Sequence, residues 1–167
     1  MIKVAILMGS INDAPILEKC FETLKEFDVE FEAKVLSAHR TPDETAEFAK
    51  NAAKNGIKVI ICAAGMAAHL GGVVASLTTL PVIGIPIASE PFNGLDSLMS
   101  MVQMPPGIPV AVVTAGKAGA QNAALYAISI LALSDKNLSE KLKNYREKQK
   151  EKILEFDKKL KEKLNIK

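Results

Sequence analysis

Short apolar runs alternate with stretches of helical periodicity along most of this chain. The apolar runs predict strands over residues 2–8, 31–36, 59–64, 82–87 and 110–114. Apolar positions spaced three and four apart predict helices over residues 13–27, 42–55, 67–77, 95–103 and 120–133. The last three strands are almost entirely apolar, as expected of parallel strands covered on both faces. Repeated βα units of this kind predict an α/β fold, a three-layer, doubly wound parallel sheet of the flavodoxin-like type.

The last stretch of the chain has a different pattern. Residues 135–167 carry twelve Lys or Arg and seven Asp or Glu, so this segment has a net charge of +5 and the rest has −3. Its apolar side chains recur at helical spacing: Leu138, Leu142, Tyr145, Ile153, Phe156, Leu160 and Leu164. We expect an α/β catalytic domain over residues 1–134 and a basic amphipathic helix over residues 135–167. Alternating Lys and Glu favour a contact with a neighbouring subunit over nucleic-acid or membrane binding.

Composition excludes several classes of protein. Hydrophobic residues make up 49% and charged residues 24% of the 167 positions, which is typical of a globular chain rather than a disordered one. The apolar runs are shorter than the roughly 20 residues that span a bilayer, and no signal-peptide pattern is visible at the start. Cys20 and Cys62 have no metal-ligand spacing. We expect buried, reduced thiols in a cytoplasmic protein.

Three polar segments follow the first three predicted strands. In open parallel sheets ligands bind beyond the carboxyl ends of the strands, where the strand order reverses. The segments are residues 9–13, 37–40 and 64–69, and they contain Arg40 and both histidines of the chain. The sequence therefore predicts one site built from three junctions at one edge of the sheet.

The first junction has the composition of an anion site. Gly9 allows a close turn after the strand, and Ser10, Asn12 and Asp13 follow at a helix start. Free N–H groups and the helix dipole favour an anion such as phosphate there. The segment is neither a Walker loop nor a dinucleotide fingerprint. The alternative is an ordinary N-cap by Asn12 or Asp13, with Pro15 in the first turn.

The second junction combines an arginine with a histidine. Residues 41–44, Thr-Pro-Asp-Glu, match a capping box, which places residues 37–40 in the preceding loop. Arg40 can donate two hydrogen bonds to a phosphate, and a histidine such as His39 can carry a proton near neutral pH. The alternatives are a histidine bonded to the loop backbone and an arginine paired with Asp43.

The third junction is built from small residues. Gly65 and Ala67 would let a flat ligand approach the backbone, and Leu70 follows them. We expect His69 about one turn into the next helix, where a packed histidine is the alternative. The sequence has no metal-ligand pairing, nucleophile elbow or candidate Cys–His pair. We therefore expect no metal, no nucleotide cofactor and no covalent intermediate.

Five stretches of the sequence together resemble the PurE family of purine biosynthesis. They are MGSINDAP, SAHRTPDET, AAGMAAHLGGVVASLTTLPVIGIPI, NGLDSLMSMVQMPPGIPVAVV and AGAQNAALYAISIL, within residues 2–133. The resemblance implies an N5-carboxyaminoimidazole ribonucleotide mutase, which moves a carboxyl group from the exocyclic nitrogen to ring carbon C4 without a cofactor. It also implies a homo-octamer with a small ribonucleotide as substrate. SAHRTP favours this branch over direct carboxylation of aminoimidazole ribonucleotide with CO2.

The resemblance also assigns roles to individual residues. His39 would be the general acid/base, while Ser37 and Arg40 would bind the phosphate. The remaining expected substrate contacts are Gly9, Ser10, Asn12 and Asp13 at the ribose-phosphate end, and Gly65, Ala67, His69 and Leu70 at the imidazole and carboxyl group. Asn12 and Gly71 depart from the family, which usually has serine and proline there.

Residues 96–105 are expected to complete the site and to supply subunit contacts. Apolar side chains at Leu98, Met99, Met101 and Val102 are more than one helix face can bury in a monomer. A non-catalytic phosphate-binding module remains an alternative, but it would not need His39 beside Arg40.

Overall fold

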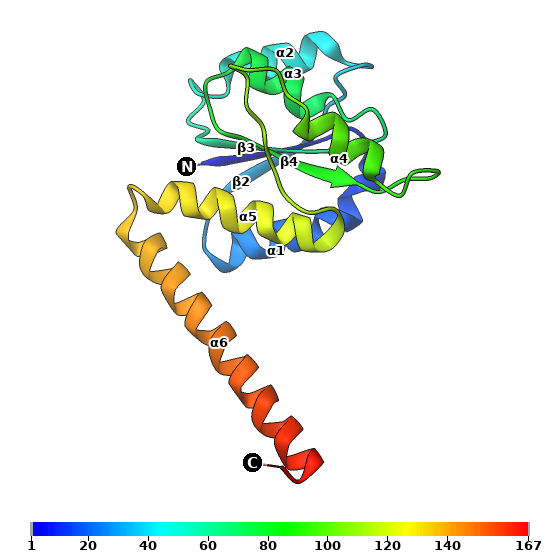
Figure 1. The fold of residues 1–167 in the computed structure, drawn as a ribbon. Coiled ribbons are helices and arrows are strands. Elements are labelled where there is room, and N and C mark those ends of the chain that lie inside the picture. Colours follow the sequence, from blue (N-terminus) through cyan, green and yellow to red (C-terminus); the bar gives the residue numbers. More distant parts are fainter. Residues whose placement is uncertain (1, 167) are drawn as a thin grey trace. The chain divides into compact units, whose positions relative to one another are not determined.

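A five-stranded parallel sheet forms the centre of the α/β unit (Figure 1). The computed structural model describes residues 2–166. The strands lie in the order β2-β1-β3-β4-β5, with bounds β1 (Val4–Met8), β2 (Phe31–Val35), β3 (Val59–Gly65), β4 (Val82–Ile87) and β5 (Ala111–Val112). The chain runs from β1 outward to β2 and returns past β1 to β3, so the order reverses between β1 and β3. The predicted doubly wound, flavodoxin-like fold is confirmed.

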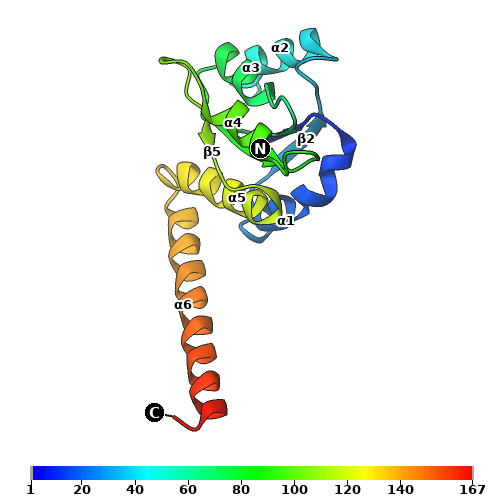
Figure 2. The same ribbon diagram turned by 45° about the vertical axis from the view of Figure 1, so that its right-hand side comes forward.

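Helices cover both faces of the sheet. They are the 3₁₀ helix η1 (Ile11–Asp13), α1 (Ala14–Glu26), α2 (Pro42–Asn51), α3 (Leu70–Leu77), α4 (Leu95–Val102), α5 (Gly116–Ala132) and α6 (Lys136–Leu164). Figures 1 and 2 show α1 and α5 on one face and α2, α3 and α4 on the other. Crossovers between parallel strands are right-handed. The chain moves one way along the sheet from β1 to β2 and the opposite way from β2 to β5, so the helices of these two parts fall on opposite faces.

Element bounds differ from the sequence prediction mainly at junctions and at the sheet edge. The fourth strand has its predicted bounds, whereas β5 shrinks to Ala111–Val112 because it pairs only with β4. The helix predicted from residue 67 begins at Leu70, after a bend at Met66 and Ala67 in which Met66 has a φ of 56°. The helix predicted to residue 55 ends at Asn51 and is followed by turns.

The core is formed by strand side chains that are buried on both faces of the sheet. All residues of β1 are buried, and β1 pairs in register with β3 from Val4 opposite Val59 to Met8 opposite Ala63. Cys20 and Cys62 are free and buried, as predicted. Burial raises the pKa of the Cys20 thiol to about 12.

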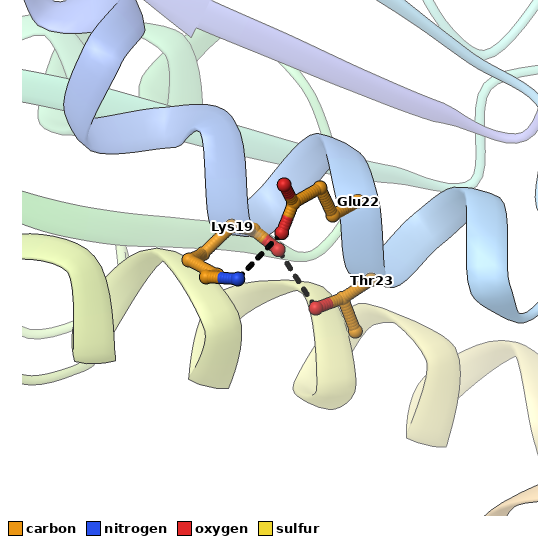
Figure 3. Close-up of polar contacts among 3 residues, drawn as sticks. All are labelled: Lys19, Glu22 and Thr23. Atoms are coloured by element: carbon orange, nitrogen blue, oxygen red, sulfur yellow. Dashed lines mark hydrogen bonds and ion pairs between the residues drawn. The ribbon is translucent and has the colours of Figure 1, made fainter.

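Helix α1 shows how a buried hydroxyl is satisfied in this fold. Thr23 is 3% exposed, and its Oγ1 donates to the Lys19 carbonyl oxygen at 2.7 Å (Figure 3). On the exposed side the Lys19 ammonium pairs with Glu22 at 2.7 Å. The hydroxyl is paired because a helix offers a carbonyl oxygen one turn back.

The chain divides into two compact units, Met1–Ile130 and Leu131–Lys167. In the second unit, Asp135 caps α6 by accepting hydrogen bonds from the backbone N–H groups of Asn137 and Leu138. Ion pairs one turn apart, such as Lys150 with Glu147 at 2.7 Å, follow its surface. Lys167, part of the predicted tail helix, lies outside the described residues. Within residues 2–166 no helix has the length and apolarity needed to cross a membrane.

Candidate active site

A cleft of about 880 Å³ opens at the carboxyl edge of the sheet. The segments after β1, β2, β3 and β4 form its walls, so the three predicted junctions meet and a fourth joins them. Every predicted site residue lines the cleft: Gly9, Ser10, Asn12, Asp13, Ser37, His39, Arg40, Gly65, Ala67, His69 and Leu70. Among the described residues, segment 96–105 contributes no side chain to these walls, although we expected it to complete the site.

The first junction is locked by a capping box around Ser10. Its Oγ accepts from the Asn12 backbone N–H at 3.2 Å, and the Asp13 carboxylate accepts from the Ser10 backbone N–H at 3.2 Å. Asp13 occupies the N-cap position of α1 with a proline in the first turn, as the alternative expected, but its side chain bonds backward to Ser10 and makes no cap hydrogen bond into α1. Partial burial raises the pKa of Asp13, and the hydrogen bond from Ser10 opposes part of that rise.

The second junction is closed by Thr41, but the predicted capping box is absent. The Thr41 side chain makes no hydrogen bond into α2. Its Oγ1 instead accepts from the Ser37 N–H at 2.9 Å and donates to the Ser37 carbonyl oxygen at 3.1 Å. The turn between them leaves backbone groups of Ser37 that need partners, and the Thr41 hydroxyl supplies them.

Arg40 connects the first two junctions. One guanidinium nitrogen, Nη2, donates to the Gly9 carbonyl oxygen at 2.6 Å, and the backbone N–H of Arg40 donates to Ser37 Oγ at 3.2 Å. Arg40 makes these contacts and not the ion pair with Asp43 that was the alternative. They place a permanent positive charge beside the Ser10 capping box. We call Gly9, Ser10, Asn12, Asp13, Ser37 and Arg40 the anchor end of the cleft.

The two histidines form a direct pair. His39 Nε2 lies 2.8 Å from His69 Nδ1, and the rings are edge-on, with centroids 5.0 Å apart and planes at 86°. One ring donates the shared proton and the other accepts it, depending on the tautomer. His69 lies before α3 at its N-cap position and is exposed, so placing it one turn into the helix was wrong. The side chain of His39 thus bonds to His69 and not to the loop backbone, so that alternative is also wrong.

The β3 junction approaches the β4 end closely. A Cβ on Gly65 would lie 3.2 Å from the Ile87 carbonyl oxygen, so glycine permits this packing. The next residue, Met66, is exposed and has a φ of 56°. A left-handed backbone costs an unbranched residue about 1–2 kcal/mol, and such strain clusters at functional sites.

Three further wall residues, Ala38, Ala64 and Met66, lie within the predicted junction segments. Sequence reasoning missed the others: Ile16, Ile87, Ala88 and Ser89. The rule about carboxyl ends of strands could have found those after β4, since β4 was predicted with its observed bounds.

An α/β fold of this topology, with a polar anchor and paired imidazoles in one cleft, defines a ligand-binding protein equipped for proton transfer. The AIR carboxylase family matches residues 3–152, and the chain belongs to this family. It is 56% identical to the N5-carboxyaminoimidazole ribonucleotide mutase of Pyrococcus abyssi over 88% of this chain and 83% of that protein. It is 54% identical to the mutase of Methanocaldococcus jannaschii over 95% and 98% of the two chains. The crystal structure of Treponema denticola PurE superposes with a TM-score of 0.87 at 36% identity, covering 96% of this chain and 99% of that one.

Proposed function

We propose that this protein is an N5-carboxyaminoimidazole ribonucleotide mutase of purine biosynthesis. The observation that carries the proposal is the His39–His69 pair, which shares a cleft with Arg40 and the Ser10 capping box. The relatives that share about half of their residues with this chain carry the same activity in their names.

The anchor end suits the ribose phosphate. Ser10 and Ser37 bring hydroxyl groups, and Arg40 brings a charge that no pH in the working range removes. Asp13 can accept from a ribose hydroxyl. Contacts with this part of the substrate are remote from the reacting atoms, so their binding energy serves to hold the imidazole in position.

At the other end of the cleft, where the two histidines lie, the reaction needs one proton donated and one removed. In the first step His39 protonates the exocyclic nitrogen of the carbamate, the N–C bond breaks and CO2 is released into the cleft. In the second step C4 of the imidazole attacks that CO2, and His39 removes the C4 proton as the ring regains aromaticity. The proton count balances on one imidazole, and His69 orients that imidazole through their hydrogen bond.

A paired turnover assay tests the proposal. The full chain is mixed with N5-carboxyaminoimidazole ribonucleotide, or with aminoimidazole ribonucleotide and bicarbonate, and formation of 4-carboxy-5-aminoimidazole ribonucleotide is followed by its absorbance. We expect turnover of the N-carboxylated nucleotide. Turnover of the second mixture alone would instead support direct carboxylation, the activity in the family's description.

The assembly is proposed to be a homo-octamer. Apolar side chains at the β4–α4 connection and on α4 are exposed in the single chain: Phe92, Leu95, Leu98, Met99 and Val102. Patches of this kind mark subunit contacts. Light scattering at low protein concentration should give the octamer mass, and a monomer would contradict the proposal.

Helix α6 is proposed to contribute to the same assembly. It exposes an apolar stripe of its own, at Ile153, Phe156, Leu160 and Leu164. Deletion of residues 136–167 should reduce the mass of the particle. A salt-dependent shift of RNA or DNA by the full chain, lost on deletion, would instead assign the helix to nucleic acid.

A further inference from the structure

The junction after β4 forms a wall of the cleft that the proposed mechanism has not used. Ala88 and Ser89 follow β4 directly and line the cleft. The sheet order places β3 between β4 and the strands that carry the anchor end. Ser89 therefore lies on the side of the cleft that is remote from the phosphate contacts.

The hydroxyl of Ser89 has an unmet hydrogen-bonding capacity. Its Oγ is shielded from solvent and has no hydrogen-bond partner, a state that only Asp96 Oδ1 shares among side-chain atoms of the described residues. An unpaired buried polar group of this kind costs about 1–3 kcal/mol. Rotation of the hydroxyl about χ1 toward the cleft, which Ser89 lines, would let a ligand supply the missing partner and remove that cost.

Fully buried hydroxyls elsewhere in the fold are paired. Thr23 and Thr45 each donate to the carbonyl oxygen four residues back, and Ser97 donates to the Gly94 carbonyl oxygen at 2.9 Å. Ser89 follows a strand and so lacks a helical carbonyl one turn back. Ser89 is thus an exception among the shielded hydroxyls of the described residues, and it is the one that lies on the cleft wall.

The backbone around Ser89 is held from two sides. Ser97 Oγ also lies 3.0 Å from the Ile87 carbonyl oxygen, so its single hydroxyl proton is shared between the Gly94 and Ile87 carbonyl oxygens. Gly94 has a φ of 86°, and a Cβ there would lie 3.0 Å from Ala88 Cα, so this glycine permits a close contact between the two ends of the connection. The wall is thus built before a ligand arrives, which favours binding because little ordering is left to be done.

We infer that Ser89 is a substrate-binding residue that donates a hydrogen bond to the carboxyl group of the ribonucleotide. The inference rests on the proposed function. The substrate carries two anionic groups, and the anchor end takes the phosphate. A neutral hydroxyl suits the carboxyl group, which must become uncharged CO2 within the cleft. A fixed positive charge in this position would stabilise the carboxylate over CO2 and so oppose the first step.

Two nucleotides that differ only in the carboxyl group test this role. Calorimetry on the full chain compares aminoimidazole ribonucleotide with 4-carboxy-5-aminoimidazole ribonucleotide, for the wild type, Ser89→Ala and a control, Ser76→Ala. Ser76 is exposed on α3 and donates to the Val73 carbonyl oxygen at 2.7 Å, outside the cleft. Ser89→Ala should weaken the carboxylated nucleotide about tenfold, the effect of a lost hydrogen bond to a charged group. It should change the other nucleotide less than twofold, and Ser76→Ala should change neither.

Thermal unfolding separates this role from a structural one. Removing an unpaired buried hydroxyl should leave the Tm of Ser89→Ala equal to or above that of the wild type. Equal weakening of both nucleotides, unchanged affinity for the carboxylated one, or a lowered Tm would overturn the inference. A wild-type chain that does not turn over N5-carboxyaminoimidazole ribonucleotide would instead contradict the proposed function, whatever Ser89→Ala does.

Discussion

The two ends of the cleft differ in how far their polar groups are already paired. At the anchor end, Ser10 bonds Asp13 and Asn12, while Arg40 bonds Ser37 and Gly9. The other end, which we call the reaction end, comprises His39, Gly65, Met66, His69 and Ser89. There the histidine pair is the main polar contact, Ser89 Oγ is unpaired, and Met66 has a left-handed backbone.

This difference follows from what each end has to do. A phosphate keeps its charge throughout the reaction, so groups that hold it can be fixed in advance by hydrogen bonds within the protein. Groups around the carboxyl must exchange a proton and contact first a carboxylate and then CO2. They therefore have to keep hydrogen-bonding capacity free, even though this lowers the stability of the free protein.

The largest effect should come from removing the proton carrier at the reaction end. His39→Asn keeps a polar side chain but cannot donate and accept a proton in turn, so kcat should fall about 10²–10⁴-fold. Affinity for the carboxylated nucleotide, measured by calorimetry, should change only a few-fold. Unimpaired turnover would refute the assigned role.

Removing the charge at the anchor end should have a different signature. Arg40→Ala should raise KM about 10–100-fold through loss of a charged hydrogen-bonding group, with kcat much less affected. Ribose 5-phosphate should lose its ability to compete with substrate. Arg146→Ala, on the helix α6, is the matched control and should leave KM unchanged. An unchanged inhibition constant for ribose 5-phosphate in Arg40→Ala would argue against a phosphate contact.

The capping box offers a direct contrast between the two ends in stability. Ser10→Ala removes the side-chain half of the box, so the free energy of unfolding should fall by about 1 kcal/mol. Ser89→Ala should cause no such loss. Urea denaturation of both variants measures the contrast, and equal destabilisation would remove the distinction between a paired and an unpaired hydroxyl.

The smallest effect should be a pH dependence at Asp13. Burial raises the pKa of this carboxyl in the folded state, so ionisation is less favourable there than in the unfolded chain. The stability it contributes is present at low pH and is lost as the pH rises through the folded-state pKa. Asp13→Asn should therefore be slightly more stable than the wild type at about pH 7 and no different at about pH 3. Thermal unfolding at both pH values checks this, and a destabilised variant at neutral pH would show that the bond to Ser10 outweighs burial.

The two ends of the cleft also show which features of the site could be predicted from the sequence. Apolar runs and polar junctions were enough to predict the parallel sheet and to place His39, Arg40 and Ser10 at one edge, because all carboxyl ends of parallel strands meet there. Local capping was mispredicted. Thr41 matches the capping-box sequence, yet its hydroxyl closes the preceding turn, and the box forms at Ser10.

By itself, then, the sequence determined the layers, most strand bounds to within one residue and most of the segments that line the cleft, because these depend on periodicity and on turn-forming residues within a few positions. Only the tertiary structure decided which side chains meet. His39 bonds to His69, thirty residues away along the chain, and Arg40 bonds to the Gly9 carbonyl oxygen, thirty-one residues away along the chain. Ser89 is left unpaired for the same reason. Hydrogen bonds form between atoms within about 3 Å, and which atoms come that close depends on how separate βα units pack rather than on the residues beside them in the chain.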